Sequence, residues 1–376
     1  RAADLCKTTN PPTKKLHEGR YFVCHEPDYE HRERATEQPA RSERAVKSGD
    51  GKAEVILTVD HVSCTFSVRR GLFGKRKPLQ ALDDVSLNLK KGEVLALVGE
   101  SGCGKTTLTR TIMGLQAPST GSVTLNGQRI ENLPPMERAR MIQPIFQDPY
   151  SSLNPRKTIG EIIAKPLVVH GIGSSHEQHK RVRDMMELVG LPSRVFNSYP
   201  DQLSGGQRQR AAIGRALILN PEVVICDEPT SALDVSVQAQ ILNLLLDLRD
   251  ELDLTYLFVT HNLSVVQHMA DRVAVMYLGE IVECGERDQV MSSPKHPYTH
   301  ALMDSALSIS PGESVPYPGL SGDFPNPMNR PGGCPFHPRC PIAEQQCREQ
   351  APGPELIDNT LVQCWKAKTA GSQLKS

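Results

Sequence analysis

Residues 99–107 read Gly-Glu-Ser-Gly-Cys-Gly-Lys-Thr-Thr and fit the pattern G-x-x-x-x-G-K-[ST], a phosphate-binding loop (the P-loop). The flanks suit the motif, because Glu93–Val98 is an apolar run typical of a buried strand and Lys105–Leu115 is compatible with a helix. Glycines let successive N–H groups turn inward toward an anion, and a helix N-terminus adds partial positive charge. The motif assigns Lys105 to the β- and γ-phosphates of a nucleotide and the Thr106 hydroxyl to Mg2+.

The composition is that of a globular protein with room for about two domains, with 376 residues of which 38% are hydrophobic and 23% are charged. The formal net charge is zero, so no bulk attraction to nucleic acid or to an acidic membrane is implied. No apolar run approaches the ~18 residues of a membrane span, and no N-terminal signal pattern is present. Because the first residue is Arg1 and not Met, we expect a fragment or a processed product.

The order of the remaining patterns predicts the fold class. Apolar or alternating strand patterns occur at 55–59, 62–68, 81–89, 122–125, 141–146, 223–226, 256–260, 272–277 and 280–283. Helical spacing occurs at 158–167, 176–189, 237–252 and 262–270. Strands that alternate with helices predict an α/β fold with a parallel sheet, an antiparallel portion near the start and a helical insertion.

Polar side chains follow three of the predicted strands. Asp227 ends a buried strand, where a carboxylate can hold Mg2+, and Glu228 is placed to polarise a water for attack on a γ-phosphate. His261 ends the next strand, and Gln147 begins a loop rich in turn-forming residues. Taken alone, Asp-Glu at a strand end is common, a lone His is more often structural, and Gln147 is an ordinary loop residue. The upstream P-loop favours the functional interpretation of all four.

At Leu203-Ser-Gly-Gly-Gln207 the sequence resembles ATP-binding-cassette (ABC) ATPases. The P-loop, Gln147, this signature, Asp227-Glu228, Ser231-Ala-Leu-Asp234 and His261 occur in the family's order within about residues 54–295. The resemblance implies a P-loop NTPase of the ABC type, with a mixed sheet core and a helical subdomain at about 150–220. It also implies a head-to-tail dimer, in which each ATP lies between one P-loop and the partner's signature.

The same resemblance implies roles for individual residues. Phe66 becomes the candidate aromatic that stacks on adenine, although a core aromatic at a strand edge is the alternative. Glu228, His261 and Gln147 are implied in hydrolysis, and Thr106, Gln147 and Asp227 in holding Mg2+. The residues implied to contact ATP are Phe66, Gly99, Ser101, Gly102, Cys103, Gly104, Lys105, Thr106, Thr107, Ser204, Gly205, Gly206, Gln207 and Asp234.

A narrower resemblance is to the ATPases of dipeptide and oligopeptide importers. It rests on Asp148–Arg156, Asp234–Gln240, His296-Pro-Tyr-Thr299 and the tail Gly333–Cys340. It implies an ATP-hydrolysing subunit, peripheral on the cytoplasmic face of the membrane, that works with two permease subunits and an external solute-binding protein. Such importers carry peptides, nickel, glutathione or related small solutes, and the solute's identity is not encoded in the ATPase.

Two other functions agree less well with the sequence. A soluble cassette that acts on ribosomes or DNA predicts basic surfaces and no importer tail, and both the neutral charge and the tail argue against it. A non-hydrolysing regulatory cassette is disfavoured, because Lys105, Glu228 and His261 are all present.

Four cysteines of the tail follow the spacing C-x5-C-x6-C-x16-C, at Cys334, Cys340, Cys347 and Cys364. Four cysteines in a Pro-rich, weakly structured segment can bind an iron–sulfur cluster or zinc, and this spacing matches neither a ferredoxin run nor a paired zinc ribbon. The importer resemblance favours a [4Fe–4S] cluster that staples a segment too small to form a core. Zinc and no metal remain alternatives, and His337 is a spare nitrogen ligand. Four other cysteines fall in predicted core elements and are interpreted as reduced thiols: Cys64, Cys103, Cys226 and Cys284.

The N-terminus repeats part of this tail. Cys6 and Cys24 are 18 residues apart and Cys347 and Cys364 are 17 apart, with similar residues before each first cysteine. Residues 1–30 are therefore interpreted as the remnant of a preceding Cys-rich tail, with chance similarity as the alternative. Residues 31–53 are charged and predict a flexible linker, 54–292 the ABC nucleotide-binding domain and 293–376 a Cys-rich extension. The chain would then be the second half of a tandem ATPase.

Overall fold

The structure, a computed structural model, describes residues 13–15, 21–23, 54–69, 76–307 and 324–370. The chain divides into two compact units, residues 1–52 and 53–376. In the first unit, strands β1 (Thr13–Lys15) and β2 (Tyr21–Val23) form an antiparallel hairpin. Cys6, Cys24 and the predicted linker 31–53 lie outside the described residues. No helix in the described part of the chain is long and apolar enough to cross a membrane.

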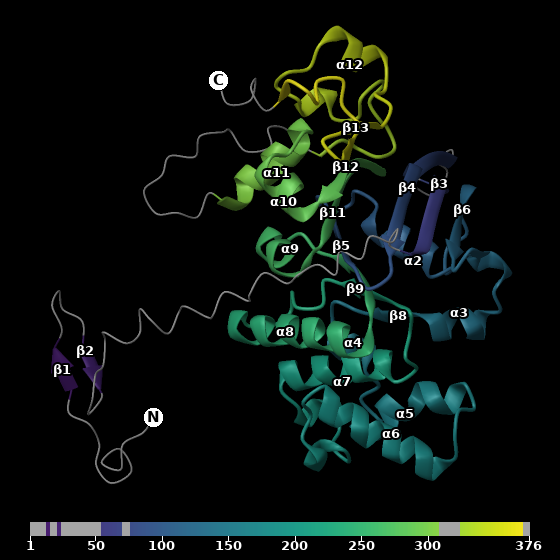
Figure 1. Cartoon of the computed structure of the whole chain (residues 1–376), viewed down its shortest axis with the longest axis vertical. Coiled ribbons are helices and arrows are strands. Elements are labelled where there is room, and N and C mark those ends of the chain that lie inside the picture. The colour runs from purple at the N-terminus through teal and green to yellow at the C-terminus, as the bar shows by residue number, and fades with distance from the viewer. Residues whose placement is uncertain (1–12, 16–20, 24–53, 70–75, 308–323, 371–376) are drawn as a thin grey trace. The chain divides into compact units, whose positions relative to one another are not determined.

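The second unit is built on a mixed sheet of eight strands in the order β13-β14-β12-β11-β5-β10-β9-β8 (Figure 1). Strands β5 and β10 are five-residue apolar runs that are buried at every position, as expected for strands covered on both faces. Because the core strands are parallel, the P-loop, Asp227 and His261 all follow the same edge of the sheet. The parallel strands are β5 (Val94–Val98), β8 (Ile142–Ile145), β9 (Val223–Asp227), β10 (Thr255–Val259) and β11 (Arg272–Tyr277).

A second, antiparallel sheet has the order β4-β3-β6-β7. Two strands predicted at 55–59 and 62–68 are one long strand, whose pairing register shifts between Val59 and Val62. The reason is local, since His61 takes a left-handed backbone (φ 49°) that bulges the strand without ending it. Helix α2 (Lys105–Ile112) shares one buried apolar cluster with both sheets. The strands are β3 (Val55–Arg69), β4 (Arg76–Lys90), β6 (Thr120–Leu125) and β7 (Gln128–Arg129).

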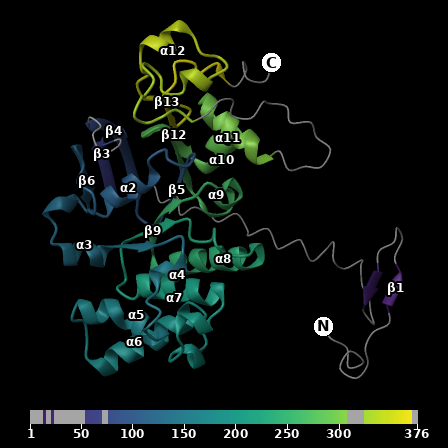
Figure 2. The ribbon, with the colours of Figure 1, turned by 180° about the vertical axis from the view of Figure 1, so that it is seen from behind.

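The predicted helical insertion is present, at the end of the unit farthest from the tail in both ribbon views (Figure 1, Figure 2). Three of its helices begin with capping boxes, in which Thr158 pairs with Glu161, Ser174 with Glu177 and Ser204 with Gln207. Apolar side chains from α5, α6 and α7 form one core with one face of strands β8, β9 and β10 and with helix α8 (Val235–Leu252). The helices of the insertion are α4 (Pro149–Ser152), α5 (Ile159–Val169), α6 (Ser175–Leu188) and α7 (Gly205–Leu217), and α3 (Pro135–Met141) precedes it before β8.

The tail is more ordered than the sequence indicated. Strand β14 pairs with β12, with Val362 opposite Glu283, so the tail extends the main sheet. Phe336, Cys334 and Cys347 are buried in one cluster with cassette residues such as Tyr277. The tail shares this core with the cassette, so it is not the weakly structured segment that the sequence indicated. The remaining elements are α9 (Leu263–Met269), β12 (Glu280–Glu286), α10 (Arg287–Ser292), α11 (Pro297–Leu307), α12 (Gln345–Glu349), β13 (Glu355–Ile357) and β14 (Thr360–Val362).

Candidate nucleotide site

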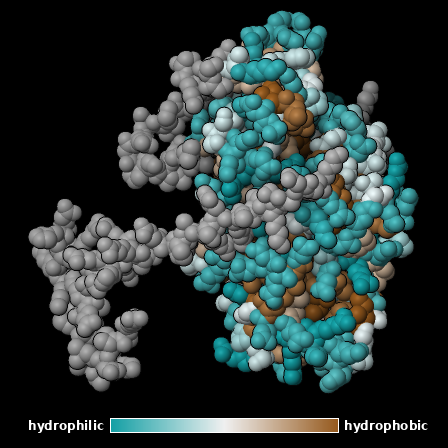
Figure 3. Space-filling model, viewed as in Figure 1, coloured by the Kyte–Doolittle hydropathy of each residue, from teal (hydrophilic) through white to brown (hydrophobic). Residues whose placement is uncertain are grey.

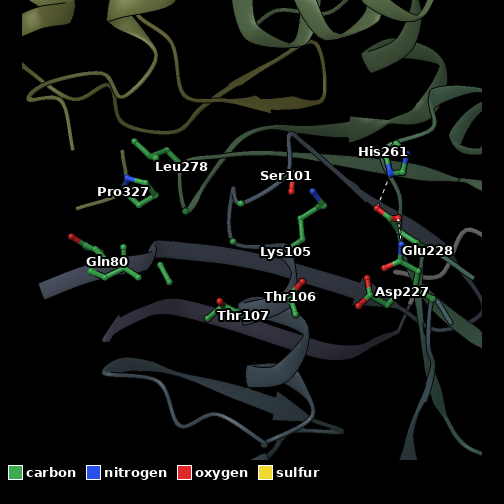
Figure 4. A pocket seen from close by; sticks show the side chains of 16 residues that line it. Gln80, Ser101, Lys105, Thr106, Thr107, Asp227, Glu228, His261, Leu278 and Pro327 are labelled. Carbon is green, nitrogen blue, oxygen red and sulfur yellow. Dashed lines mark hydrogen bonds and ion pairs between the residues drawn. The ribbon is translucent and has the colours of Figure 1, made fainter. Parts of the chain in front are cut away.

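A cleft of about 700 Å³ opens where the P-loop and the ends of β9 and β10 meet. The structure brings ten of the predicted site residues to this cleft. Figure 4 shows that the side chains labelled there come from separate strands and loops. These ten are Ser101, Gly102, Gly104, Lys105, Thr106, Thr107, Gln147, Asp227, Glu228 and His261.

The P-loop has the backbone that its glycines predict. Gly104 has φ 116°, and a Cβ at this position would lie 2.7 Å from the carbonyl oxygen of Ala81, so the turn excludes any larger residue. Gly102 has φ 82° and would place a Cβ in open space, which leaves room for a ligand beside the backbone. Lys105 Nζ donates to the carbonyl oxygens of Gly99 (2.7 Å) and Glu100 (3.0 Å), so the ammonium group is held at the loop.

Two oxygen-bearing side chains of the cleft suit a magnesium ion. Asp227 ends β9, and Thr106 lies in the first turn of α2. Burial raises the pKa of Asp227, and the neighbouring Glu228 carboxylate raises it further, while Lys105 and Arg110 oppose the shift. A cation would relieve that penalty, and carboxylate and hydroxyl oxygens are ligands that Mg2+ prefers. The residues therefore fit the ion that the sequence implied.

Glu228 is held by both of its predicted neighbours. Its Oε1 lies 2.7 Å from His261 Nδ1, and its Oε2 accepts from Gln147 Nε2 at 3.2 Å (Figure 4). The backbone of Glu228 is left-handed (φ 46°), which is unusual for a residue with a Cβ and is typical of functional sites. The carboxylate is thus oriented from two sides, as a base that must meet one water molecule requires.

The signature segment lies outside the cleft. Ser204 caps α7, since its hydroxyl accepts from the N–H of Gln207 (3.3 Å), and the Gln207 side chain accepts in turn from the N–H of Ser204 (3.1 Å). A Cβ at Gly206 would lie 2.7 Å from Val237, so this glycine allows α7 to pack closely on α8. Ser204 and Asp234 are exposed on the surface.

Three further predicted residues do not line the cleft. Phe66 is partly buried and packs against the apolar core, opposite Leu79, which does line the cleft. Cys103 is buried, 3.8 Å from Lys105 Nζ. The carbonyl oxygen of Gly99 accepts a hydrogen bond from Lys105 Nζ.

Comparison with known proteins identifies the family. Residues 82–231 match the family described as ABC transporter, and residues 282–347 match the family described as oligopeptide/dipeptide transporter, C-terminal region. The chain is 48% identical over 304 residues to the dipeptide transport ATP-binding protein DppF of Haemophilus influenzae, which covers 80% of this chain and 93% of that protein. The chain belongs to the ATP-binding subunits of oligopeptide/dipeptide ABC transporters. The di/tripeptide transport ATP-binding protein DppF of Pseudomonas aeruginosa is 44% identical over 318 residues, which cover 84% and 98% of the two chains.

Solved ABC cassettes share the fold. The dimeric structure of a post-hydrolysis state of the ATP-binding cassette MJ0796, bound to ADP and Pi, has a TM-score of 0.54 and 32% identity, over 62% of this chain and 99% of that one. CbiO1 of Clostridium perfringens, part of an ABC transporter complex, has a TM-score of 0.56 and 28% identity, over 64% and 92%. The predicted ABC-type α/β fold and ATPase activity are confirmed. A cassette that acts on ribosomes or DNA is not favoured, because the relatives are transport proteins.

Several cleft residues of this ABC subunit were missed from the sequence. Leu79, Gln80 and Ala81 of β4 form one wall, and Leu278-Gly279 and Pro327 form another. The Leu-Gly pair was a detectable signal, because Gly279 has φ 87° in the turn between β11 and β12. Pro327 carried no such signal, since it reaches the cleft only through the folding of the tail.

The four tail cysteines of this transporter subunit line one small cavity, with His296, Phe336 and His337 among their neighbours. Burial raises the pKa of the Cys334 thiol to about 12, and those of Cys340 and Cys364 to about 11. Within the residues that the structure describes, no group of three or more His, Cys, Asp or Glu side chains is arranged to hold a metal ion. The structure thus gathers the cysteines without giving them a ligand geometry.

Proposed function

We propose that this subunit binds and hydrolyses ATP to drive the import of peptides or related small solutes through a membrane transporter, at whose cytoplasmic face it acts. The observation that carries the proposal is the convergence of Lys105, Asp227 and the Gln147–Glu228–His261 contacts in one cleft. The names of the relatives supply the solute class, because nothing in the cleft would contact a peptide.

The P-loop is proposed to bind the phosphates of ATP. Lys105 and the N–H groups at the start of α2 would bind the β- and γ-phosphates of ATP. Thr106 and Asp227, with Gln147, would hold Mg2+, which neutralises phosphate charge when it is bound. Phe66 is proposed to reach adenine beside Leu79, its partner across the β3–β4 pair.

Glu228 is proposed as the general base of hydrolysis. Its carboxylate would accept a proton from the water that attacks the γ-phosphate. His261 and Gln147 would position that carboxylate, and the contacts at 2.7 and 3.2 Å support this role. The left-handed backbone of Glu228 aims the side chain into the cleft.

A second cassette is proposed to complete each site. The exposed positions of Ser204 and Asp234, away from the cleft of their own cassette, support a head-to-tail dimer. Ser204, Gly205, Gly206 and Gln207 lie at the N-terminus of the 13-residue helix α7, where an incoming γ-phosphate would meet hydroxyl and N–H donors.

The membrane partners are proposed to dock beside Gln147. Phe146, Tyr150 and Tyr199 are each more than 40% exposed although they are large and apolar or aromatic. The Arg208 guanidinium stacks 3.8 Å from the Tyr150 ring centroid, which gives this surface a rigid base. Apolar residues also gather over the helical part of the face seen in Figure 3. This surface fits a short cytoplasmic segment of each permease subunit, through which closure of the dimer would reach the membrane.

The tail cysteines are proposed to hold a [4Fe–4S] cluster, with zinc as the alternative. Four sulfur donors from a loop, the short helix α12 and the segment after β14 line one cavity, and thiolates suit either group. In the described residues the four side chains are not arranged to hold a metal ion, so ligation would need them to rearrange. The role would be structural, since four ligand bonds would tie these segments together.

We propose that residues 1–30 are the end of an earlier Cys-rich tail in a tandem protein, that 31–53 are a linker, and that 54–292 and 293–376 are the nucleotide-binding domain and its Cys-rich extension. The two hairpins support it. β1 begins seven residues after Cys6 and β13 begins eight after Cys347, and each pairs antiparallel with the strand that follows. Chance similarity between two Pro-rich segments would not explain a hairpin at a similar distance from a cysteine in both.

The proposed function is tested by reconstitution with the two permease subunits in liposomes. We expect labelled di- or oligopeptide to accumulate inside only with ATP and with an external solute-binding protein. The same preparation should not sediment with ribosomes or retain DNA. Uptake that is independent of ATP, or purification with ribosomes in place of permeases, would overturn the assignment.

A further inference from the structure

Glu100, the second residue of the P-loop, contacts two residues from outside the P-loop as well as Lys105 within it. Arg339 of the tail donates two hydrogen bonds to its carboxylate, from Nη1 to Oε2 at 2.7 Å and from Nη2 to Oε1 at 3.1 Å. The N–H of Glu100 donates to the hydroxyl oxygen of Tyr298 at 2.9 Å. Its carbonyl accepts from Lys105 Nζ at 3.0 Å. All three polar parts of this residue are therefore engaged, two of them by the segments that carry the importer resemblance.

Arg339 is itself fixed by the cysteine tail. It ends the short 3-10 turn His337–Arg339, between Cys334 and Cys340, and its side chain is only 4% exposed. Its guanidinium lies 5.9 Å from the centre of the Tyr277 ring. That ring packs on Phe336 and Tyr298, with centroids 5.3 and 4.7 Å apart. Because Arg339 rests on these aromatic rings, its two hydrogen bonds fix the orientation of the Glu100 carboxylate as well as neutralise its charge.

We propose that Arg339 is a positioning residue of the ATP site, through which the order of the cysteine pocket sets nucleotide affinity. The proposal rests on the proposed P-loop function but not on which metal the cysteines hold. Glu100 adds a negative charge beside the place where the triphosphate would bind. Arg339 neutralises that charge and fixes the loop backbone from behind. Without it, an unpaired and partly buried carboxylate would repel the phosphates, and the loop would lose an anchor.

The test is equilibrium binding of a fluorescent ATP analogue, with Mg2+, to the full chain. For Arg339→Gln we expect about tenfold weaker binding, which equals about 1.4 kcal/mol. Arg339→Lys, which keeps the charge but not the two-point geometry, should fall between that variant and wild type. The matched control is Lys295→Gln, which removes another ion pair of the tail (to Asp358, 2.9 Å) that does not reach the P-loop. It should bind like wild type.

Two double variants separate the causes. Glu100→Gln with Arg339→Gln should regain part of the lost affinity, because the unpaired charge is gone. Cys340→Ser should weaken binding as Arg339→Gln does, and the two together should be no worse than either alone. In hydrolysis, the effect should appear in KM and leave kcat near wild type. Wild-type affinity in both Arg339 variants, or equal losses in Arg339→Gln and Lys295→Gln, would overturn the inference. Failure of the wild-type chain to bind nucleotide would instead overturn the proposed function.

Discussion

The ATP cleft and the cysteine pocket gather their reactive side chains in different ways. Lys105, Asp227 and His261 follow neighbouring parallel strands, whose pairing places them together before any ligand binds. The cysteines lie on loops and on one short helix, and they share a cavity without forming a metal site in the described residues. The edge of a parallel sheet fixes the positions of its functional side chains without a ligand. In a site built from loops, the final arrangement of the side chains depends on the ligand that they would bind.

The cleft should therefore show the largest effect of a single substitution. Glu228→Gln keeps the shape and hydrogen-bonding capacity of the side chain but removes the base, so we expect ATP turnover to fall about 100-fold or more. ATP binding should persist and trap a closed dimer. Turnover is measured in the assembled transporter.

Lys105→Ala should weaken ATP binding itself, because the phosphate-binding ammonium group is lost.

The matched control for Glu228→Gln is Glu222→Gln. Glu222 lies at the opposite end of β9, where it accepts from Asn126 Nδ2 at 2.6 Å, away from the cleft. It receives the same chemical change and should hydrolyse ATP normally. Near-wild-type turnover in Glu228→Gln would show that this carboxylate is not the general base.

The sequence could point to ten residues that line the cleft because they belong to local motifs at the ends of apolar strands. The P-loop and Asp227-Glu228 each combine a strand pattern with functional residues that follow at once, so short-range spacing suffices. The contacts of Glu100 could not be predicted, since Tyr298 and Arg339 lie 198 and 239 residues further along the chain. Nor could the order of the tail, because β14 is stabilised by pairing with β12 and shows little strand pattern of its own.

The second prediction concerns the half of the site that a single cassette lacks. Turnover per molecule should rise with protein concentration, because Ser204 must come from a partner. Val235, 82% exposed beside Asp234, offers a way to block that partner. We expect Val235→Glu to lower turnover about tenfold at a fixed low concentration, since a buried unpaired charge opposes association. Turnover and the oligomeric state in light scattering are measured together.

The control places the same charge on α5, at Val169, which is 50% exposed. Val169→Glu should leave both turnover and association of the isolated subunit unchanged. A rate that does not depend on concentration, from a proven monomer, would contradict the shared-site proposal.

The third prediction concerns the metal content of the loop-built pocket. Anaerobically purified protein should be brown and contain about four irons per tail. Cys340→Ser should lose the colour and the iron but still bind ATP, with reduced affinity. Cys64→Ser is the control, because Cys64 is a buried core thiol beside Thr111 Oγ1 (3.5 Å) and outside the pocket. If the protein contains stoichiometric zinc and no iron, the pocket is a zinc site and not a cluster site. If it contains neither metal, the four cysteines are reduced thiols.

The smallest effect on stability is expected where Arg330 of the tail forms ion pairs with Asp83 of β4 and Glu280 of β12. Burial raises the pKa of Glu280 from 4.5 to about 7, against the opposing charge of Arg330. The folded protein therefore binds a proton at Glu280 more tightly than the unfolded chain does. This contribution to stability is full below pH 4.5 and is lost as the pH rises through 7. Between pH 8 and pH 6, wild type should gain about 1 kcal/mol of unfolding free energy relative to Glu280→Gln, which keeps an acceptor for Arg330 but does not titrate. Urea unfolding of both proteins at the two pH values measures the difference, and parallel pH profiles would show that Glu280 is ionised in the fold.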